Sequence, residues 1–296
     1  MKNKFLQISM LALTAGSLIF TSCSKESTTS SDPNNSNAET FKSTKKALFL
    51  YYTGSECNPC GSAGIPNYDA VANDLNMKDK VIGVVVHTNA PAKDSMADVS
   101  DANTAGGELI QLIISGGSYS APTFLVPPNA PSSGSASTAR TAYAGYVNTF
   151  STQAPVAAVN VSIKNVDGIY NVITRTKFLK DDKGDFKVSA LVIEDGVVYH
   201  QVANSKMVTP YTHNQVLRGK FSTSAFGDDL KNGNVTSGEI VEKTLLGFVP
   251  VNIPSTSVRY WNKANLSVVV VVWRHTTVGT TKTIEVINCE KVKLPL

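Results

Sequence analysis

Cys57 and Cys60 are the residues of this sequence best placed to do chemistry, because two cysteines three positions apart can form a disulfide with each other. They follow an apolar, aromatic-rich segment at residues 45–52, which reads as a buried strand. Pro59 between them suits the first turn of a helix, where its missing N–H would have no partner. We therefore expect the pair at the start of a helix that comes directly after a strand.

At a helix start, unsatisfied N–H groups and the positive end of the dipole lower the pKa of a cysteine thiol. Cys57 is then the expected nucleophile, and Cys60 the thiol that resolves the mixed disulfide. Glu56 works against this chemistry, because a neighbouring negative charge disfavours the thiolate. A redox-active pair and a purely structural disulfide both stay open, since exported proteins oxidise such pairs readily.

The remaining candidates for site chemistry are few. A zinc site at the pair would need two more ligands, and His87 and more distant residues offer no paired spacing, so we predict no metal and no cofactor. Cys289 lies in the last predicted strand and is expected to be a buried, inert thiol. The formal net charge is +4, without a basic block, so no nucleic-acid partner is expected.

The N-terminus has the form of an export signal. Residues 1–22 combine a short basic segment with an apolar stretch too short for a comfortable membrane span. Cys23 follows small residues at the end of that stretch, which resembles a bacterial lipobox. We expect cleavage before Cys23 and a lipid on its thiol that anchors the chain to a membrane. Residues 23–44 are rich in Ser, Asn and Thr, and read as a disordered tether.

Residues 45–152 and 153–296 differ in pattern. The first region reads as strand, helix and strand at 45–52, 61–75 and 81–87, which indicates a βαβ unit with parallel strands. A third strand is expected at 123–126 and a helix at 136–150, but no fourth strand is evident. The second region alternates like an antiparallel β-sandwich of immunoglobulin type, with strands expected at 156–163, 170–178, 186–194, 266–274 and 283–289.

The first region resembles a thioredoxin fold. An aromatic strand, Thr53-Gly54, the Cys-x-x-Cys pair at a helix start and the later Ala121-Pro122-Thr123 before a strand carry the resemblance. The resemblance implies that Pro122 is a cis-proline packed beside the pair and supporting it. It also implies protein thiols or disulfides as the partners of the reaction.

The whole layout resembles the outer membrane protein 28 family of Bacteroidota lipoproteins. Besides Cys23 and the Cys-x-x-Cys segment, the motif His-Asn-Gln-Val-Leu-Arg-Gly at 213–219 carries this resemblance. The family implies an α/β plus all-β architecture: a thioredoxin-like domain followed by an antiparallel immunoglobulin-like β-sandwich, lipid-anchored in the cell envelope and associated with the outer membrane. It supplies no established reaction. We therefore expect thiol–disulfide exchange, with a non-catalytic surface binding or assembly lipoprotein as the alternative.

Several further residues have a weaker interpretation. Ser95, within Asp-Ser-Met, resembles a short O-glycosylation signal. His213, Asn214 and Arg218 are expected in a loop between strands, with a ligand site as the alternative. His200 is expected at the surface.

Overall fold

The structure is a computed structural model, and it describes residues 41–88, 104–114, 118–249, 261–279 and 281–296. Residues Thr40–Leu296 form one compact unit. Cys23 and Ser95, the predicted lipidation and glycosylation sites, lie outside the described residues. None of the described helices is long and apolar enough to cross a membrane.

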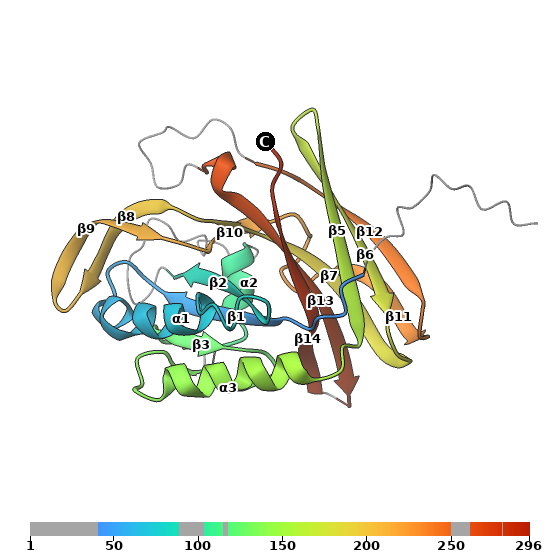
Figure 1. The fold of residues 1–296 in the computed structure, drawn as a ribbon, viewed down its shortest axis with the longest axis horizontal. Helices are drawn as coiled ribbons and strands as arrows, with labels where there is room; N and C mark the ends of the chain where they lie inside the picture. The colour runs from blue at the N-terminus through green and yellow to red at the C-terminus, as the bar shows by residue number, and fades with distance from the viewer. Residues whose placement is uncertain (1–40, 89–103, 115–117, 250–260, 280) are drawn as a thin grey trace, which may run out of the picture. The chain divides into compact units, whose positions relative to one another are not determined.

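The first part of the unit contains the predicted βαβ arrangement (Figure 1). Strands β1 and β2 pair in parallel, with Ala47 opposite Val81 and Thr53 opposite His87. Strand β3 runs antiparallel to β1 on its other side and pairs with the very short β4. The elements are β1 (Ala47–Thr53), η1 (Cys60–Gly64), α1 (Ile65–Ala72), β2 (Val81–His87), α2 (Ala105–Ile110), β3 (Thr123–Leu125), β4 (Ser132–Ser133) and α3 (Ala139–Thr152).

The helix expected at 61–75 begins as a π-helical turn, η1, and continues as α1. Pro66 has no N–H to donate to the preceding turn, so the first turns cannot form a complete α-helical ladder. Helix α1 ends at Ala72, and the Asn73 N–H donates to the Asp69 carbonyl at 3.0 Å.

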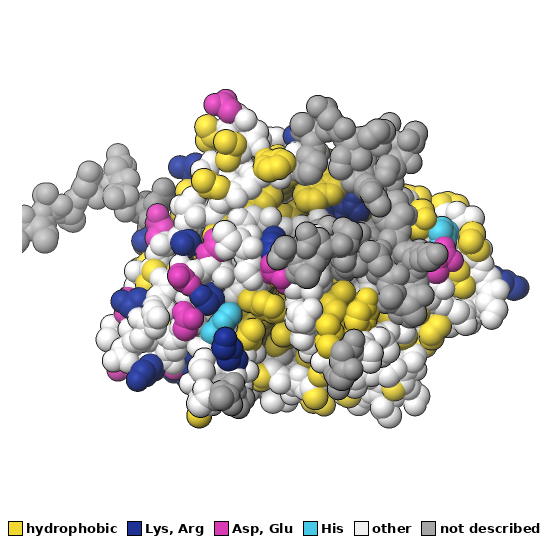
Figure 2. Space-filling view, turned by 180° about the vertical axis from the view of Figure 1, so that it is seen from behind, with side chains coloured by type: hydrophobic (Ala, Val, Ile, Leu, Met, Phe, Trp, Pro, Cys, Tyr) yellow, Lys and Arg dark blue, Asp and Glu magenta, His cyan; other side chains and the backbone are white. Residues whose placement is uncertain are grey.

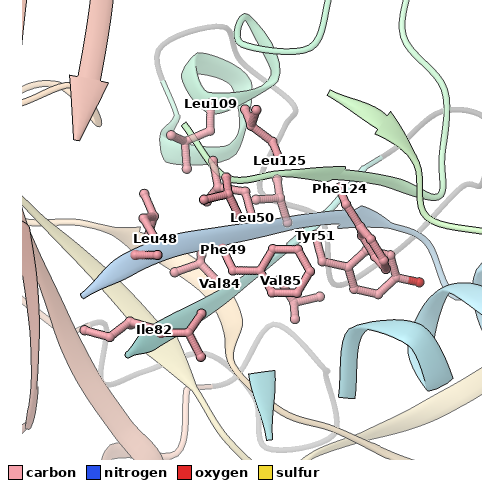
Figure 3. Packing of buried hydrophobic residues seen from close by; sticks show 14 of the residues in the cluster. Leu48, Phe49, Leu50, Tyr51, Ile82, Val84, Val85, Leu109, Phe124 and Leu125 are labelled. Atoms are coloured by element: carbon pink, nitrogen blue, oxygen red, sulfur yellow. The ribbon is translucent and has the colours of Figure 1, made fainter. Parts of the chain in front are cut away.

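Aromatic side chains around β1 form the centre of this core (Figure 3). All seven residues of β1 are buried. The ring of Phe49 lies 5.0 Å from that of Tyr68, 5.2 Å from Phe124 and 5.4 Å from Tyr143, measured between centroids. Because these rings come from α1, β3 and α3, the packing fixes the three elements around the strand that leads to Cys57.

The second part of the unit is almost entirely β, as its alternating pattern predicts. Its elements are β5 (Ala157–Val166), β6 (Ile169–Phe178), β7 (Asp182–Glu194), β8 (Val197–Ala203), β9 (Lys206–His213), β10 (Val216–Lys220), β11 (Asp228–Val235), β12 (Ile240–Phe248), η2 (Lys263–Asn265), β13 (Leu266–Val278) and β14 (Thr281–Lys293).

A single nine-stranded sheet joins the two parts. Its order is β14-β13-β7-β10-β2-β1-β3-β4, and β11 also pairs with β7. Strand β10 lies parallel to β2, where Val216 pairs with Val85. In the first region the very short β4 is the fourth strand that the sequence did not show, and strands from beyond residue 153 extend the sheet on its other side. The boundary at residue 153 stays a prediction, but the two regions do not have separate sheets.

Residues 188–194 of β7 and 266–273 of β13 are buried on both faces because each strand contributes to two cores. Leu191, Val271 and Trp273 belong to the core that contains β1. Their neighbours Val192 and Val270 face the opposite way, toward a second core that the three-stranded sheet β12-β6-β5 covers. Two sheets therefore pack over this second core, as in a β-sandwich. The immunoglobulin type of the sandwich stays a prediction.

Charges of both signs are mixed on the face shown in Figure 2, over the strands near β11 and β12. Lys231 pairs with Glu239 at 2.9 Å, Arg175 with Glu242 at 3.4 Å, and Lys187 with Asp229. Such exposed pairs contribute little to stability, typically about 0–1 kcal/mol. On the described part of this face the charges alternate in sign and do not gather into one basic patch.

Cys289 is buried in β14, as expected. Burial raises the pKa of its thiol well above the ordinary value, because the thiolate would lose its hydration. A thiol of that kind is a poor nucleophile.

Candidate functional site

Cys57 and Cys60 form a disulfide at the start of the helix that follows β1. Cys57 is 6% exposed and Cys60 is completely buried, so Cys57 is the more accessible residue of the pair. The Cys60 N–H donates to the Cys57 Sγ at 3.2 Å. After reduction, the same N–H would face a Cys57 thiolate, and hydrogen bonds to a charged acceptor are the stronger kind.

The Ala121–Pro122 peptide bond is cis and lies beside the pair. The Ala121 carbonyl oxygen is 3.7 Å from the Cys57 Sγ, and Ala121 packs against both cysteines. A Cβ added at Gly64 would lie 2.9 Å from the Pro122 Cβ, so the helix approaches the proline closely. The supporting role of Pro122 in a reaction stays a prediction.

Tyr51 holds the carbonyl end of the Cys-x-x-Cys turn from inside the core. Its hydroxyl donates to the Cys60 carbonyl at 3.1 Å and accepts from the Thr53 hydroxyl at 3.0 Å. Burial raises the pKa of the Tyr51 hydroxyl far above its ordinary value, so the group stays a neutral donor.

The hairpin of β8 and β9, here called the β8–β9 hairpin, covers the segment that carries the disulfide. The Val202 N–H donates to the Ser55 carbonyl at 2.7 Å. The Gln201 Nε2 donates to three backbone carbonyls of this segment. It lies 3.2 Å from the carbonyl oxygens of Gly54 and Ser55 and 3.4 Å from that of Cys57. Gln201 is 1% exposed, so one buried side chain collects most of the outward carbonyls of this turn.

The tip of the β8–β9 hairpin rests on the helix that begins at Cys60. Asn204 and Ser205 both have positive φ, 51° and 59°, as in the two-residue turns that match the twist of paired strands. The Asn204 N–H donates to the Ser62 Oγ at 2.7 Å, and the Ser205 N–H to the Asn58 Oδ1 at 2.6 Å. A Cβ at Gly61 would lie only 2.2 Å from the Val202 carbonyl oxygen, so glycine permits this close approach.

Glu56, the charge that counts against a thiolate, pairs with His200 of β8. The register of β8 and β9 shifts between Tyr199 and Gln201, which places His200 at a bulge. His200 is half-buried, with a side chain that is 15% exposed, and it contacts the residue before Cys57. A protonated His200 would offset the negative charge beside the pair.

The motif at 213–219 builds the base of the hairpin and gathers no single ligand site. The Asn214 Oδ1 accepts from the Gly196 N–H at 3.0 Å, and the Gln215 N–H donates to the Asp195 Oδ1 at 2.8 Å. Arg218 forms an ion pair with Glu194 at 3.0 Å, with both side chains buried. His213 is the last residue of β9 and Arg218 lies in β10, so the expectation that both lie in a loop between strands is wrong.

A cavity of about 40 Å³ lies between the hairpin base and the first core, and His213 and Asn214 contribute to its wall. Asp69 and His87 line it too, and the His87 and His213 rings are 5.2 Å apart. Burial raises the pKa of the Asp69 carboxyl. A volume of this size is enough to hold water. Among the described residues, no three His, Cys, Asp or Glu side chains gather as a metal site.

Sequence reasoning finds Cys57, Cys60 and Pro122 but misses Gln201 and the hairpin contacts. The Asn204-Ser205 turn between two β-patterned segments is a signal for a hairpin. No local pattern could show that this hairpin packs on a segment about 145 positions earlier, because that contact depends on the tertiary arrangement.

Comparison with solved structures finds HBP35 of Porphyromonas gingivalis, with a TM-score of 0.62 and 16% sequence identity. The match covers 86% of this chain and 77% of that one. At this identity the likeness concerns the fold alone. No curated protein matches the chain.

The family model described as outer membrane protein Omp28 matches residues 129–295, from the end of the first core through the β-rich part to the C-terminus. The match spans more than half of the chain. The protein therefore belongs to the outer membrane protein Omp28 family and is an envelope-associated protein.

Proposed function

We propose that this protein is an outer-membrane lipoprotein with a thioredoxin-like portion that exchanges disulfides with protein thiols at Cys57–Cys60. The observation that carries the proposal is the asymmetry of the pair. Cys57 is the more exposed residue of the two, and the Cys60 N–H points at the Cys57 Sγ from 3.2 Å. The cis Ala121–Pro122 bond beside Cys57 supports the same assignment.

The exchange balances as two thiolate displacements. A partner thiolate attacks the Cys57 Sγ, the Cys57–Cys60 bond breaks, and Cys60 leaves as a thiolate that takes up a proton. The partner's second thiolate then attacks the partner's first sulfur, which is bonded to the Cys57 Sγ in the mixed disulfide. Cys57 leaves as a thiolate and takes up a proton. The partner dithiol is oxidised to a disulfide, and the Cys57–Cys60 pair is reduced to two thiols.

The membrane attachment in this proposal rests on the sequence. Residues 1–22 act as a signal peptide, Cys23 carries the lipid, and residues 23–44 tether the folded unit. An anchor on Cys23 would place the disulfide in the envelope, where such bonds form and persist.

The reduction potential of the Cys57–Cys60 pair tests the exchange. We expect a reduction potential above about −300 mV, because disulfides that exchange readily lie above this value and structural disulfides lie below it. The protein is equilibrated in redox buffers, the thiols are trapped with maleimide, and the fraction of reduced Cys57 and Cys60 is read by peptide mass. Cys289 serves as an internal reference because it is a free thiol in both states. A potential clearly below about −300 mV would overturn the proposal.

A structural disulfide in a non-catalytic binding or assembly lipoprotein is the second candidate, and the burial of the pair beneath the β8–β9 hairpin favours it. If the disulfide is structural, the double variant Cys57→Ser with Cys60→Ser changes the stability of the protein and leaves its function intact. Because the closed loop is short, we expect the paired substitution to lower the free energy of unfolding by about 2 kcal/mol or less.

Urea denaturation of the double variant and the wild-type protein measures that difference, and the wild-type protein in excess reductant is the matched control. Equal losses in both would assign the effect to the bond itself. A loss well above about 2 kcal/mol would show that the serine side chains disturb the packing and that the loop-closure account is insufficient.

A further inference from the structure

We propose that the β8–β9 hairpin determines which thiols reach the Cys57–Cys60 disulfide: small thiols react with the closed form, and a protein dithiol reacts only after the hairpin lifts. This inference rests on the proposed exchange function. It adds a specificity element to the pair, built from residues outside the Cys-x-x-Cys segment.

The β8–β9 hairpin is attached to the large sheet only through its base. In the described part of the chain, β8 and β9 form a two-stranded sheet of their own, between β7 and β10 in sequence. Both connections to those strands contain a residue in the left-handed region, Gly196 with φ of 74° and Gln215 with φ of 58°. The backbone therefore turns just before β8 and just after β9. These two connections are where the β8–β9 hairpin would bend relative to the large sheet.

Among the described residues, the hairpin is held against the Cys-x-x-Cys segment by a set of polar contacts. They comprise the backbone bond from Val202 to Ser55, the Gln201 amide bonds, the side-chain contact of His200 with Glu56, and the two N–H bonds of the tip. The Gln201 Oε1 is buried and has no hydrogen-bond partner among the described residues. An unsatisfied buried acceptor raises the free energy of the closed form. The polar contacts of the hairpin must offset this cost, so they stabilise the closed form only modestly.

Closure limits access to the sulfur more for large reactants than for small ones. Cys57 is 6% exposed, and backbone atoms of the hairpin lie against Ser55, Asn58 and Ser62 on both sides of it in sequence. A protein dithiol carries its own backbone to within bonding distance of the Cys57 Sγ, and that backbone must pass the hairpin atoms that lie against Ser55 and Asn58. A small dithiol needs room for only a few atoms.

Gly61→Ala tests the proposal because the new Cβ acts as a wedge under the hairpin. It would lie 2.2 Å from the Val202 carbonyl oxygen, which must move. Gly145→Ala is the matched control, since a Cβ there meets no atom within 4 Å. For each protein we compare the rate at which the Cys57–Cys60 disulfide is reduced by excess dithiothreitol with the rate for reduced thioredoxin, a protein dithiol.

For Gly61→Ala we expect the ratio of the thioredoxin rate to the dithiothreitol rate to rise about tenfold, as for the loss of one or two hydrogen bonds that hold the closed form. Gly145→Ala should keep the wild-type ratio. Gln201→Ala alters no residue of the Cys-x-x-Cys segment and removes the amide bonds that hold the hairpin to it. It should raise the ratio in the same direction, and it is the test variant if Gly61→Ala does not fold.

An unchanged ratio in the folded variants, or a wild-type protein that thioredoxin reduces as fast as its variants, would overturn the role of the hairpin. This failure is distinct from failure of the exchange function. The rate ratio reports access to the sulfur, whereas the reduction potential reports the equilibrium of the pair, and each can fail without the other.

Discussion

Trp273→Ala should lower the free energy of unfolding by about 3–5 kcal/mol, as for deletion of a large aromatic side chain from a packed core. Trp273 is completely buried in β13, its ring packs on Phe226, and its Nε1–H donates to the Ser189 Oγ at 2.8 Å. The substitution removes the ring and leaves the Ser189 hydroxyl without that partner in the interior. Urea denaturation followed by far-ultraviolet circular dichroism measures the loss.

The same variant tests whether the shared sheet makes the two regions fold together. Trp273 belongs to the core that contains β1, although it lies more than 200 positions later in the chain. We therefore expect hydrogen exchange to accelerate in β1 as well as in β13. Val278→Ala, at a residue of the same strand that is 74% exposed, is the control and should change neither quantity. Faster exchange confined to β13 and β14 would contradict coupling through the sheet.

Arg218→Met should cost about 3–5 kcal/mol near neutral pH, because it leaves a buried carboxylate without its counter-charge. The Arg218 and Glu194 side chains are 3% and 4% exposed and lie 3.0 Å apart. The Glu194 carboxylate also accepts from the Asn262 N–H at 2.8 Å, so one oxygen keeps a partner in the variant. Thermal and urea unfolding both measure the effect.

The cost should depend on pH with a definite sign. Burial raises the pKa of the Glu194 carboxyl above its ordinary value of 4.5, and the charge of Arg218 opposes that rise. For a pKa raised by folding, the stability contribution is fully present below the unfolded value and is lost as pH rises through the folded value. Without Arg218 the folded pKa rises further, so the difference between variant and wild type should shrink as pH falls toward 4.5.

The double variant Glu194→Leu with Arg218→Met is the control for the ion pair. With both charges gone, no buried carboxylate is left unpaired, and most of the stability should return at every pH. A single Arg218→Met variant whose loss is the same at pH 4.5 and at neutral pH would show that packing, including the contact of Arg218 with the Trp261 ring, accounts for the effect.

Whether a feature of this fold can be predicted from the sequence depends on how far apart in the chain the interacting residues lie. Residues 47–53 and 81–87 are continuous apolar runs, and each forms a strand buried on both faces because such runs gain most from full burial. The helix start at Cys60 follows from Pro59, which lacks a donor where the helix needs none. These features depend on neighbours within a few positions, and the sequence predicts them.

The pairing of distant strands is different. The run at 266–273 reads as a buried strand, but its sequence does not show that alternate side chains enter two different cores. Which strand lies beside β2 is decided by the packing of the whole unit, and the answer, β10, comes from beyond residue 153. Local periodicity reports that a face is buried without naming what buries it.

The sequence by itself determined the position of Cys57 and Cys60 at a helix start, the β-rich character of residues 153–296 and the resemblance to an envelope family. Only the tertiary structure decided that the pair is almost fully buried and that Gln201, Asn204 and Ser205 close over it. Each of those contacts joins polar groups more than 140 positions apart. Their partners are brought together by the packing of the whole unit, so no local pattern encodes them.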